Sequence, residues 1–126
     1  ITPAESYTSA DLEWNDKRSR RSVEMSDPAS RPAIGGEALN ADGYDVIFLG
    51  YPVWWNLAPR IVNTFVESHD LNGKTVIPFA TSGSSGIANS AAALKETYPD
   101  IDWKEGKLLN RASAGDIREW VGKLGY

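Results

Sequence analysis

The chain has 126 residues, of which 41% are hydrophobic and 24% charged, so it can bury one core and is too short for two ordinary domains. Its net charge of −4 opposes binding to nucleic acid, which depends on clustered lysine and arginine. The chain contains no cysteine, which excludes disulfides, thiolate metal sites and cysteine nucleophiles and fits a reducing compartment.

The first part of the chain, residues 1–43, shows little hydrophobic periodicity. Prolines and glycines are scattered among polar residues, so we predict a long ordered loop or wrapping arm. Its basic cluster, residues 17–21, lies among acidic residues and is interpreted as a solvated mixed-charge loop. Structureless loops of this length are usually functional or contain an overlooked element, and both alternatives stay open.

After this arm, the pattern alternates between strands and helices. A short apolar run over residues 45–49, ended by Gly50, predicts a strand buried on both faces. Apolar residues at helical spacing over residues 58–68 predict a helix. Pro59 suits its first turn, where the missing N–H is not needed.

The next strand is predicted over residues 75–80, after an Asn72-Gly73 turn. Pro78 argues against a central position for this strand, because proline cannot donate a hydrogen bond to a neighbouring strand. The alternation then continues. We predict a helix over residues 87–98, a weaker strand over residues 107–110, and a final helix that begins at a capping box of Ser113 and Asp116 and buries Ile117, Trp120, Val121 and Leu124.

This order of elements predicts an α/β fold with parallel strands joined by crossover helices. We expect a single domain over residues 1–126, with the arm over 1–43 and the alternating core over 44–126. Only three strands are convincing, and so small a sheet would expose a long apolar edge.

Ligands of open parallel sheets bind beyond the carboxyl ends of the strands, which directs attention to the loops at residues 50–58, 81–90 and 111–113. Within the first two loops, residues 51–56 and 81–86 are the segments with a distinctive composition. The first loop carries Tyr51, Trp54 and Trp55, on which a flat ligand can stack. The alternative is that both tryptophans pack against helices. The second loop is rich in serine and glycine, so its backbone N–H groups can approach a ligand at a helix N-terminus. The alternative there is a tight connection that needs glycine only for its backbone.

Together these loops give the chain its resemblance to the flavodoxin-like family, in particular to short bacterial flavoproteins with a Tyr-Pro-x-Trp loop. The resemblance is strongest over residues 44–86, which read YDVIFLGYPVWWNLAPRIVNTFVESHDLNGKTVIPFATSGSSG. It extends to the arm and to residues 103–113. It implies a doubly wound parallel sheet and the cofactor flavin mononucleotide (FMN).

The resemblance also implies which residues hold the flavin ring. One side of the ring would be lined by Pro52, Val53, Trp54, Trp55 and Asn56. The other would receive backbone and hydroxyl donors from Thr81, Ser82, Gly83, Ser84 and Gly86. Aromatic contact and nearby negative charge would disfavour an anionic reduced flavin and so tune its potential.

One departure from the family concerns the start of the fold. The family's first strand, phosphate-binding loop and first helix have no counterpart before Ile1, so we expect FMN affinity to be weakened or lost unless the phosphate loop is supplied in trans. The missing strand would lie beside the run from Asp45 to Leu49. Three alternatives would cover that edge: the rest of a longer natural protein, a second chain that donates the strand, or self-pairing in a homo-oligomer. We expect that this chain is not a stable monomer, and a monomeric mass in light scattering would refute this.

Two functions follow as alternatives. The first is an FMN redox protein that passes electrons to a partner protein or reduces a small acceptor such as a quinone. The second is a truncated module that no longer binds FMN and serves only as a structural or protein-interaction domain. His69 lacks a nearby nucleophile and is interpreted as a surface or capping residue, and no cluster has metal-ligand spacing.

We expect no nucleic-acid or membrane partner. No stretch approaches the roughly 18 apolar residues of a membrane-spanning helix, and no signal-peptide pattern is present, so a cytoplasmic location is expected. Because the sequence opens at Ile1 rather than at methionine, this expectation does not extend to a targeting segment ahead of it.

Overall fold

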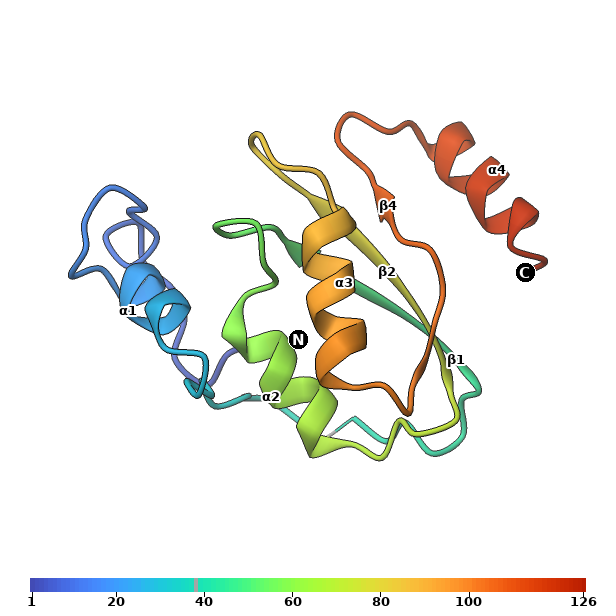
Figure 1. Cartoon of the computed structure of the whole chain (residues 1–126), viewed down its shortest axis with the longest axis horizontal. Helices are drawn as coiled ribbons and strands as arrows, with labels where there is room; N and C mark the ends of the chain where they lie inside the picture. The colour runs from blue at the N-terminus through green and yellow to red at the C-terminus, as the bar shows by residue number, and fades with distance from the viewer. Residues whose placement is uncertain (38) are drawn as a thin grey trace.

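A parallel sheet with helices on both faces forms the body of the protein in the computed structural model, which describes residues 1–37 and 39–126 (Figure 1). The predicted α/β class with parallel strands is confirmed. The elements in chain order are α1 (Arg20–Ser26), β1 (Val46–Pro52), α2 (Arg60–Ser68), β2 (Thr75–Thr81), α3 (Ala88–Thr97), β3 (Asp102–Trp103), β4 (Lys107–Leu108) and α4 (Ala114–Lys123).

Strand β2 lies in the middle of the sheet, with β1 on one side and the short strands β3 and β4 on the other. Val76 pairs with Trp103 of β3, and Ala80 pairs with Leu108 of β4. Pro78 falls between these two pairs, where the neighbouring strand is interrupted. The proline is therefore compatible with a central strand, because its missing N–H faces the gap between β3 and β4.

Strand β1 differs from its prediction in two ways. It continues through Gly50 to Pro52. The Phe79 ring lies against Gly50, where a Cβ atom would come within 2.4 Å of the ring. It is also not buried on both faces, since Phe48 keeps 38% of its surface exposed. Gly50 therefore accommodates an aromatic ring from the next strand and does not end β1.

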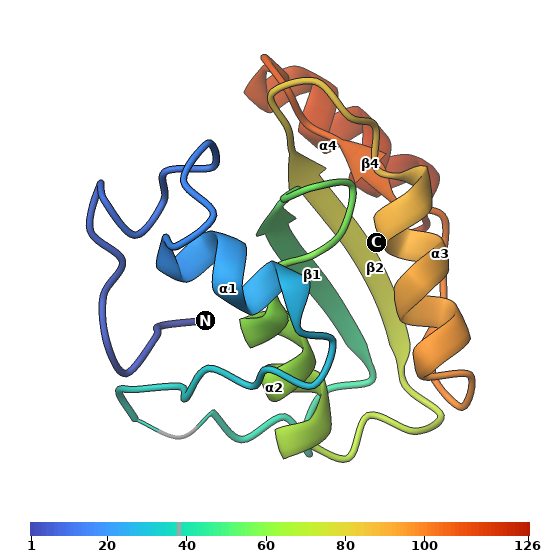
Figure 2. The same cartoon turned by 60° about the vertical axis from the view of Figure 1, so that its left-hand side comes forward.

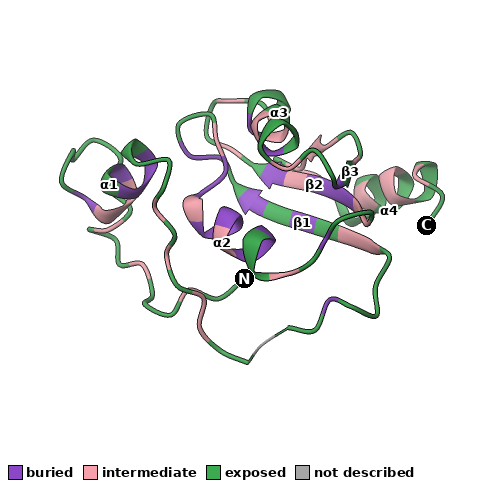
Figure 3. Ribbon diagram, turned by 60° about the horizontal axis from the view of Figure 1, so that its bottom comes forward, coloured by how far each residue is buried: buried purple, intermediate pink, exposed green. Residues whose placement is uncertain are grey.

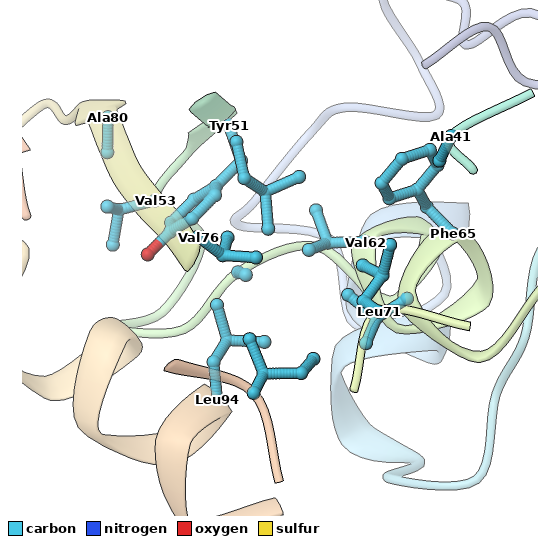
Figure 4. Packing of buried hydrophobic residues seen from close by; sticks show 13 residues of the cluster. Ala41, Tyr51, Val53, Val62, Phe65, Leu71, Val76, Ala80 and Leu94 are labelled. Atoms are coloured by element: carbon cyan, nitrogen blue, oxygen red, sulfur yellow. The ribbon is translucent and has the colours of Figure 1, made fainter. Parts of the chain in front are cut away.

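The two faces of the sheet are covered unequally (Figure 3). Helices α2 and α3 pack on one face over a core that includes Tyr51, Val62, Val76 and Leu94 (Figure 4). The other face is covered by α4, none of whose residues is buried. The four apolar residues that were predicted to be buried on α4 are only half-buried: Ile117, Trp120, Val121 and Leu124. Phe48 contacts the Trp120 ring edge-to-face at 5.9 Å between centroids.

The ends of the helices follow their capping residues. The predicted capping box of α4 is confirmed, with Ser113 accepting from the Asp116 N–H and Asp116 accepting from the Ser113 N–H. Pro59 stands at the N-cap of α2 and not inside its first turn. His69 is the C-cap residue of α2, and its ring nitrogens lie 2.9 Å and 3.0 Å from carbonyl oxygens of Phe65 and Leu39. None of the helices in the part of the chain that is described is long and apolar enough to cross a membrane.

The N-terminal arm contains a helix that sequence analysis overlooked. Helix α1 has only seven residues, too few for hydrophobic periodicity to show. Its N-cap is Ser19, whose side chain accepts a hydrogen bond from the Ser22 N–H. The interpretation of residues 17–21 as a solvated loop is wrong for Arg20 and Arg21, which form the first turn of this helix. Figure 2 shows α1 beside the loop that follows β1.

The outer edge of β1 is open over the described residues. The Thr75 N–H donates to Asp45 O at 3.0 Å and the Val53 N–H to Thr81 O at 2.8 Å, which fixes the odd-numbered residues of β1 as the ones bonded to β2. The backbone groups of Val46 and Phe48 therefore point away from the sheet. A groove of about 720 Å³ runs along this edge.

Candidate functional site

A pocket of about 660 Å³ lies at the carboxyl ends of β1 and β2, where parallel sheets bind ligands. We call it the rim pocket. Three segments distant in sequence line it: the loop after β1, the loop after β2 and the N-terminal arm. The lining residues are Trp14, Arg21, Pro52, Val53, Trp54, Trp55, Thr81, Ser82, Gly83, Ser84 and Ser85.

One side of the rim pocket, the aromatic wall, consists of residues 52–55. Trp54 and Leu57 exchange two backbone hydrogen bonds, of 2.8 Å and 3.0 Å, across a two-residue turn. Both central residues have positive φ, 48° at Trp55 and 67° at Asn56. Asparagine tolerates this region, whereas a tryptophan there is strained. The turn thus places the Trp55 side chain, 44% exposed, at the pocket.

Trp54 both lines the pocket and belongs to the packed interior. It is only 8% exposed, and the Tyr7 ring meets it edge-to-face at 5.6 Å between centroids. Tyr7 and Trp54 come from widely separated parts of the chain. The two tryptophans therefore differ. Trp54 packs in the protein interior, as the alternative interpretation expects, whereas Trp55 stays largely exposed at the pocket.

The opposite side of the rim pocket, the Ser/Gly wall, consists of residues 81–85. The Asn110 amide fixes it by accepting from the Ser82 N–H at 2.9 Å and donating to Ser82 O at 2.6 Å. The Ser82 N–H is therefore already used. In the part of the chain that is described, no hydrogen bond engages the N–H groups of Gly83 or Ser85, which remain donors for a ligand.

The two walls share one direct connection. The Val53 N–H donates to Thr81 O at 2.8 Å, so both loops leave the sheet from adjacent positions. Below them, the Tyr51 hydroxyl lies 3.0 Å from the Ser90 hydroxyl in the buried interface with α3. Burial raises the pKa of Tyr51, so this phenol is neutral and serves as a hydrogen-bonding anchor.

The structure brings together eight of the ten residues that the resemblance assigns to the flavin ring. Asn56 lies in the turn and Gly86 beyond the wall, and neither is among the lining residues. Trp14 and Arg21 also line the pocket but were not predicted, and Ser85 belongs to the predicted 81–86 loop although it was not assigned to the flavin ring. For Trp14 the available signal was a tryptophan within an otherwise polar arm, where no local pattern requires one.

The charge in the rim pocket differs from what the resemblance implies. Of the described residues that line it, none is acidic, and Arg21 contributes a positive charge. Negative charge is therefore not a feature of this pocket as far as its described lining residues show. Within the described residues no cluster of histidine and carboxylate side chains has the arrangement of a metal site.

The chain matches the sequence model of the flavodoxin family over residues 1–124. It is 62% identical to a candidate flavoprotein from Bacteroides eggerthii, with a TM-score of 0.93 over 100% of this chain and 79% of that one. A candidate flavoprotein from Bacteroides uniformis is 56% identical, also with a TM-score of 0.93, over 97% of this chain and 78% of that one.

A more distant likeness concerns the fold alone. A flavoprotein from Lactobacillus acidophilus, solved in complex with FMN, has a TM-score of 0.67 at 15% identity. The match covers 92% of this chain and 76% of that one. No curated protein sequence matches this chain.

Proposed function

The chain belongs to the flavodoxin family, and from this premise we propose that it binds the ring of FMN in the rim pocket and acts as a redox protein. The observation that carries the proposal is that the aromatic wall and the Ser/Gly wall, in which the N–H groups of Gly83 and Ser85 are unused among the described residues, line one pocket at the carboxyl ends of two parallel strands. When bound, FMN supplies reversible electron transfer. The residues of the protein bind it, orient it and exclude water from it.

The walls suit the two kinds of surface that a flavin ring presents. Its flat face is apolar and favours contact with an aromatic side chain such as Trp55. Its polar edge carries carbonyl and nitrogen acceptors, which the N–H groups of Gly83 and Ser85 can satisfy. A volume of about 660 Å³ falls within the usual range for small-molecule sites, roughly 300–1,000 Å³.

The backbone of the aromatic wall is strained at Trp55, the residue proposed to contact the ring. Trp55 holds a positive φ of 48°, which disfavours a bulky side chain, and it leaves nearly half of its surface exposed. Strain of this kind is commonly found at ligand sites, where surrounding contacts maintain it. An exposed Trp55 at the mouth of the pocket also leaves an approach for an electron acceptor, either a small molecule such as a quinone or a partner protein.

Fluorescence titration tests the binding. Adding the protein to FMN should quench flavin emission, and the protein's tryptophan emission should fall in parallel. Because the proposal assigns only the ring to the rim pocket, riboflavin, which has the ring without the phosphate, should also bind. No quenching by either flavin at tens of micromolar would contradict the proposal and favour the alternative of a structural or interaction module.

Two variants locate the site. Trp55→Ala removes the exposed aromatic face and should weaken flavin binding. Tyr44→Ala removes a more exposed aromatic side chain that does not line the rim pocket, and it should leave binding unchanged. Equal effects of the two substitutions would place the flavin elsewhere.

A further inference from the structure

Arg21 is the charged residue of the rim pocket, and it comes from an unexpected part of the chain. It lies in the first turn of α1, and its guanidinium carbon is 4.9 Å from the centroid of the Trp54 ring. It therefore reaches the aromatic wall from the arm and faces the same space as the Ser/Gly wall.

The guanidinium of Arg21 is poorly satisfied compared with that of its neighbour. Arg20 donates to Glu24 at 2.9 Å and to the carbonyl of Glu5 at 2.7 Å. Arg21 reaches only the carbonyl of Leu12, at 3.5 Å, and its Nε is buried without a hydrogen-bond partner in the described part of the chain. A buried donor without an acceptor is unfavourable, so the Arg21 guanidinium is held by fewer protein acceptors than that of Arg20.

The charge of Arg21 determines which form of a ligand this residue favours. Burial lowers the pKa of Arg21 from its ordinary value, yet an arginine remains charged at neutral pH. The charge of Glu13 acts in the opposite direction and raises the pKa of Arg21, but no carboxylate among the described lining residues forms an ion pair with Arg21. A positive charge next to a bound ring interacts more favourably with a negatively charged form of that ring than with a neutral one.

From this geometry, and resting on the proposed function, we infer that Arg21 is a charge-tuning residue that binds reduced FMN in preference to oxidised FMN. Oxidised FMN has a neutral ring, whereas the ring gains negative charge on reduction. The preference raises the midpoint potential of the bound cofactor, because a ligand state that binds more tightly becomes more populated. This is the opposite of the tuning by negative charge that the resemblance implies.

The test compares Arg21→Gln with the wild type and with Arg18→Gln, which removes the same charge from an exposed arm residue outside the rim pocket. We measure the midpoint potential of bound FMN and the affinity for oxidised FMN. Arg21→Gln should weaken binding of reduced FMN about tenfold relative to oxidised FMN, which lowers a two-electron potential by about 30 mV. Arg18→Gln should leave the potential unchanged, and Arg21→Lys should restore most of it.

The outcomes separate this inference from the proposed function. If the wild type binds no FMN, both fall. If FMN binds and Arg21→Gln has the wild-type potential, the inference about Arg21 is overturned while FMN binding stands. Circular dichroism establishes whether Arg21→Gln is folded. If it is not, the wild type decides the question, since its bound FMN should have a higher potential than free FMN and a lower one would overturn the inference.

Discussion

The two walls of the rim pocket face the same space but are held in place differently. The aromatic wall depends on the packing of Tyr7 and Arg21, side chains from an arm more than 30 residues earlier in the chain. The Ser/Gly wall depends on backbone hydrogen bonds to one side chain, that of Asn110. One pocket thus combines a wall maintained by side-chain packing with a wall maintained by two hydrogen bonds, both between residues distant in sequence.

The largest effect is expected where packing maintains the aromatic wall. Trp54→Ala removes a nearly buried indole from its contacts with Tyr7 and Arg21, and should reduce the free energy of unfolding by about 3–5 kcal/mol. Denaturant unfolding measures this change. Trp55→Ala, at the largely exposed neighbouring position, is the matched control and should change stability by less than about 1 kcal/mol. Similar losses for both would show that the arm does not hold this wall.

A smaller loss is expected at the Ser/Gly wall. Asn110→Ala removes both hydrogen bonds to Ser82 at an exposed position, and should lower the free energy of unfolding by about 1 kcal/mol. Flavin affinity should also fall, because the loop is no longer pre-organised. Asn110→Asp retains the acceptor for the Ser82 N–H but loses the donor, so its flavin affinity should lie between the other two. Wild-type affinity in Asn110→Ala would exclude this role for the asparagine.

Trp55→Gly separates binding from stability at the aromatic wall. Glycine accepts a positive φ without strain, but it also makes the unfolded chain more flexible, so stability should stay within about 0.5 kcal/mol of the wild type. Flavin affinity should fall about three- to tenfold, the worth of one aromatic contact. Trp55→Phe, which keeps an aromatic face, should bind more tightly than Trp55→Gly. A flavin affinity that is equal in both variants would contradict stacking on residue 55.

The smallest effect concerns pH and the attachment of the arm to α2. A hydrogen bond from Arg31, at 3.0 Å, and a second one from Tyr98 lower the pKa of the Glu67 carboxyl from its ordinary value of 4.5. A lowered pKa in the folded state means that the contribution to stability is present above pH 4.5 and is lost as the pH falls below it.

Glu67→Gln should therefore destabilise the protein by less than about 1 kcal/mol at pH 7, as is usual for an exposed ion pair. The difference from the wild type should shrink as the pH falls below 4.5. Unfolding by urea at several pH values measures it. A difference that is independent of pH would show that the Glu67 charge does not contribute to attaching the arm.

Sequence patterns predicted the parts of this protein whose structure is locally determined. The β2 strand, the α4 capping box and the position of both loops at one rim follow from period, capping chemistry and the topology of parallel sheets. The arm's contribution was not predictable in this way. Helix α1 is too short to show a period, and its contact with Trp54 depends on tertiary packing, which no local pattern encodes.

Pro52 has a consequence for how far the sheet can grow. Along β1, every second residue directs its N–H outward, and Val46, Phe48 and Gly50 offer such donors over the described part of the chain. Pro52 occupies the next outward position and has no N–H to offer. A strand that paired with β1 on this side would find no N–H donor at Pro52, one residue before Val53. Sheet extension along β1 would thus be interrupted just before the rim pocket.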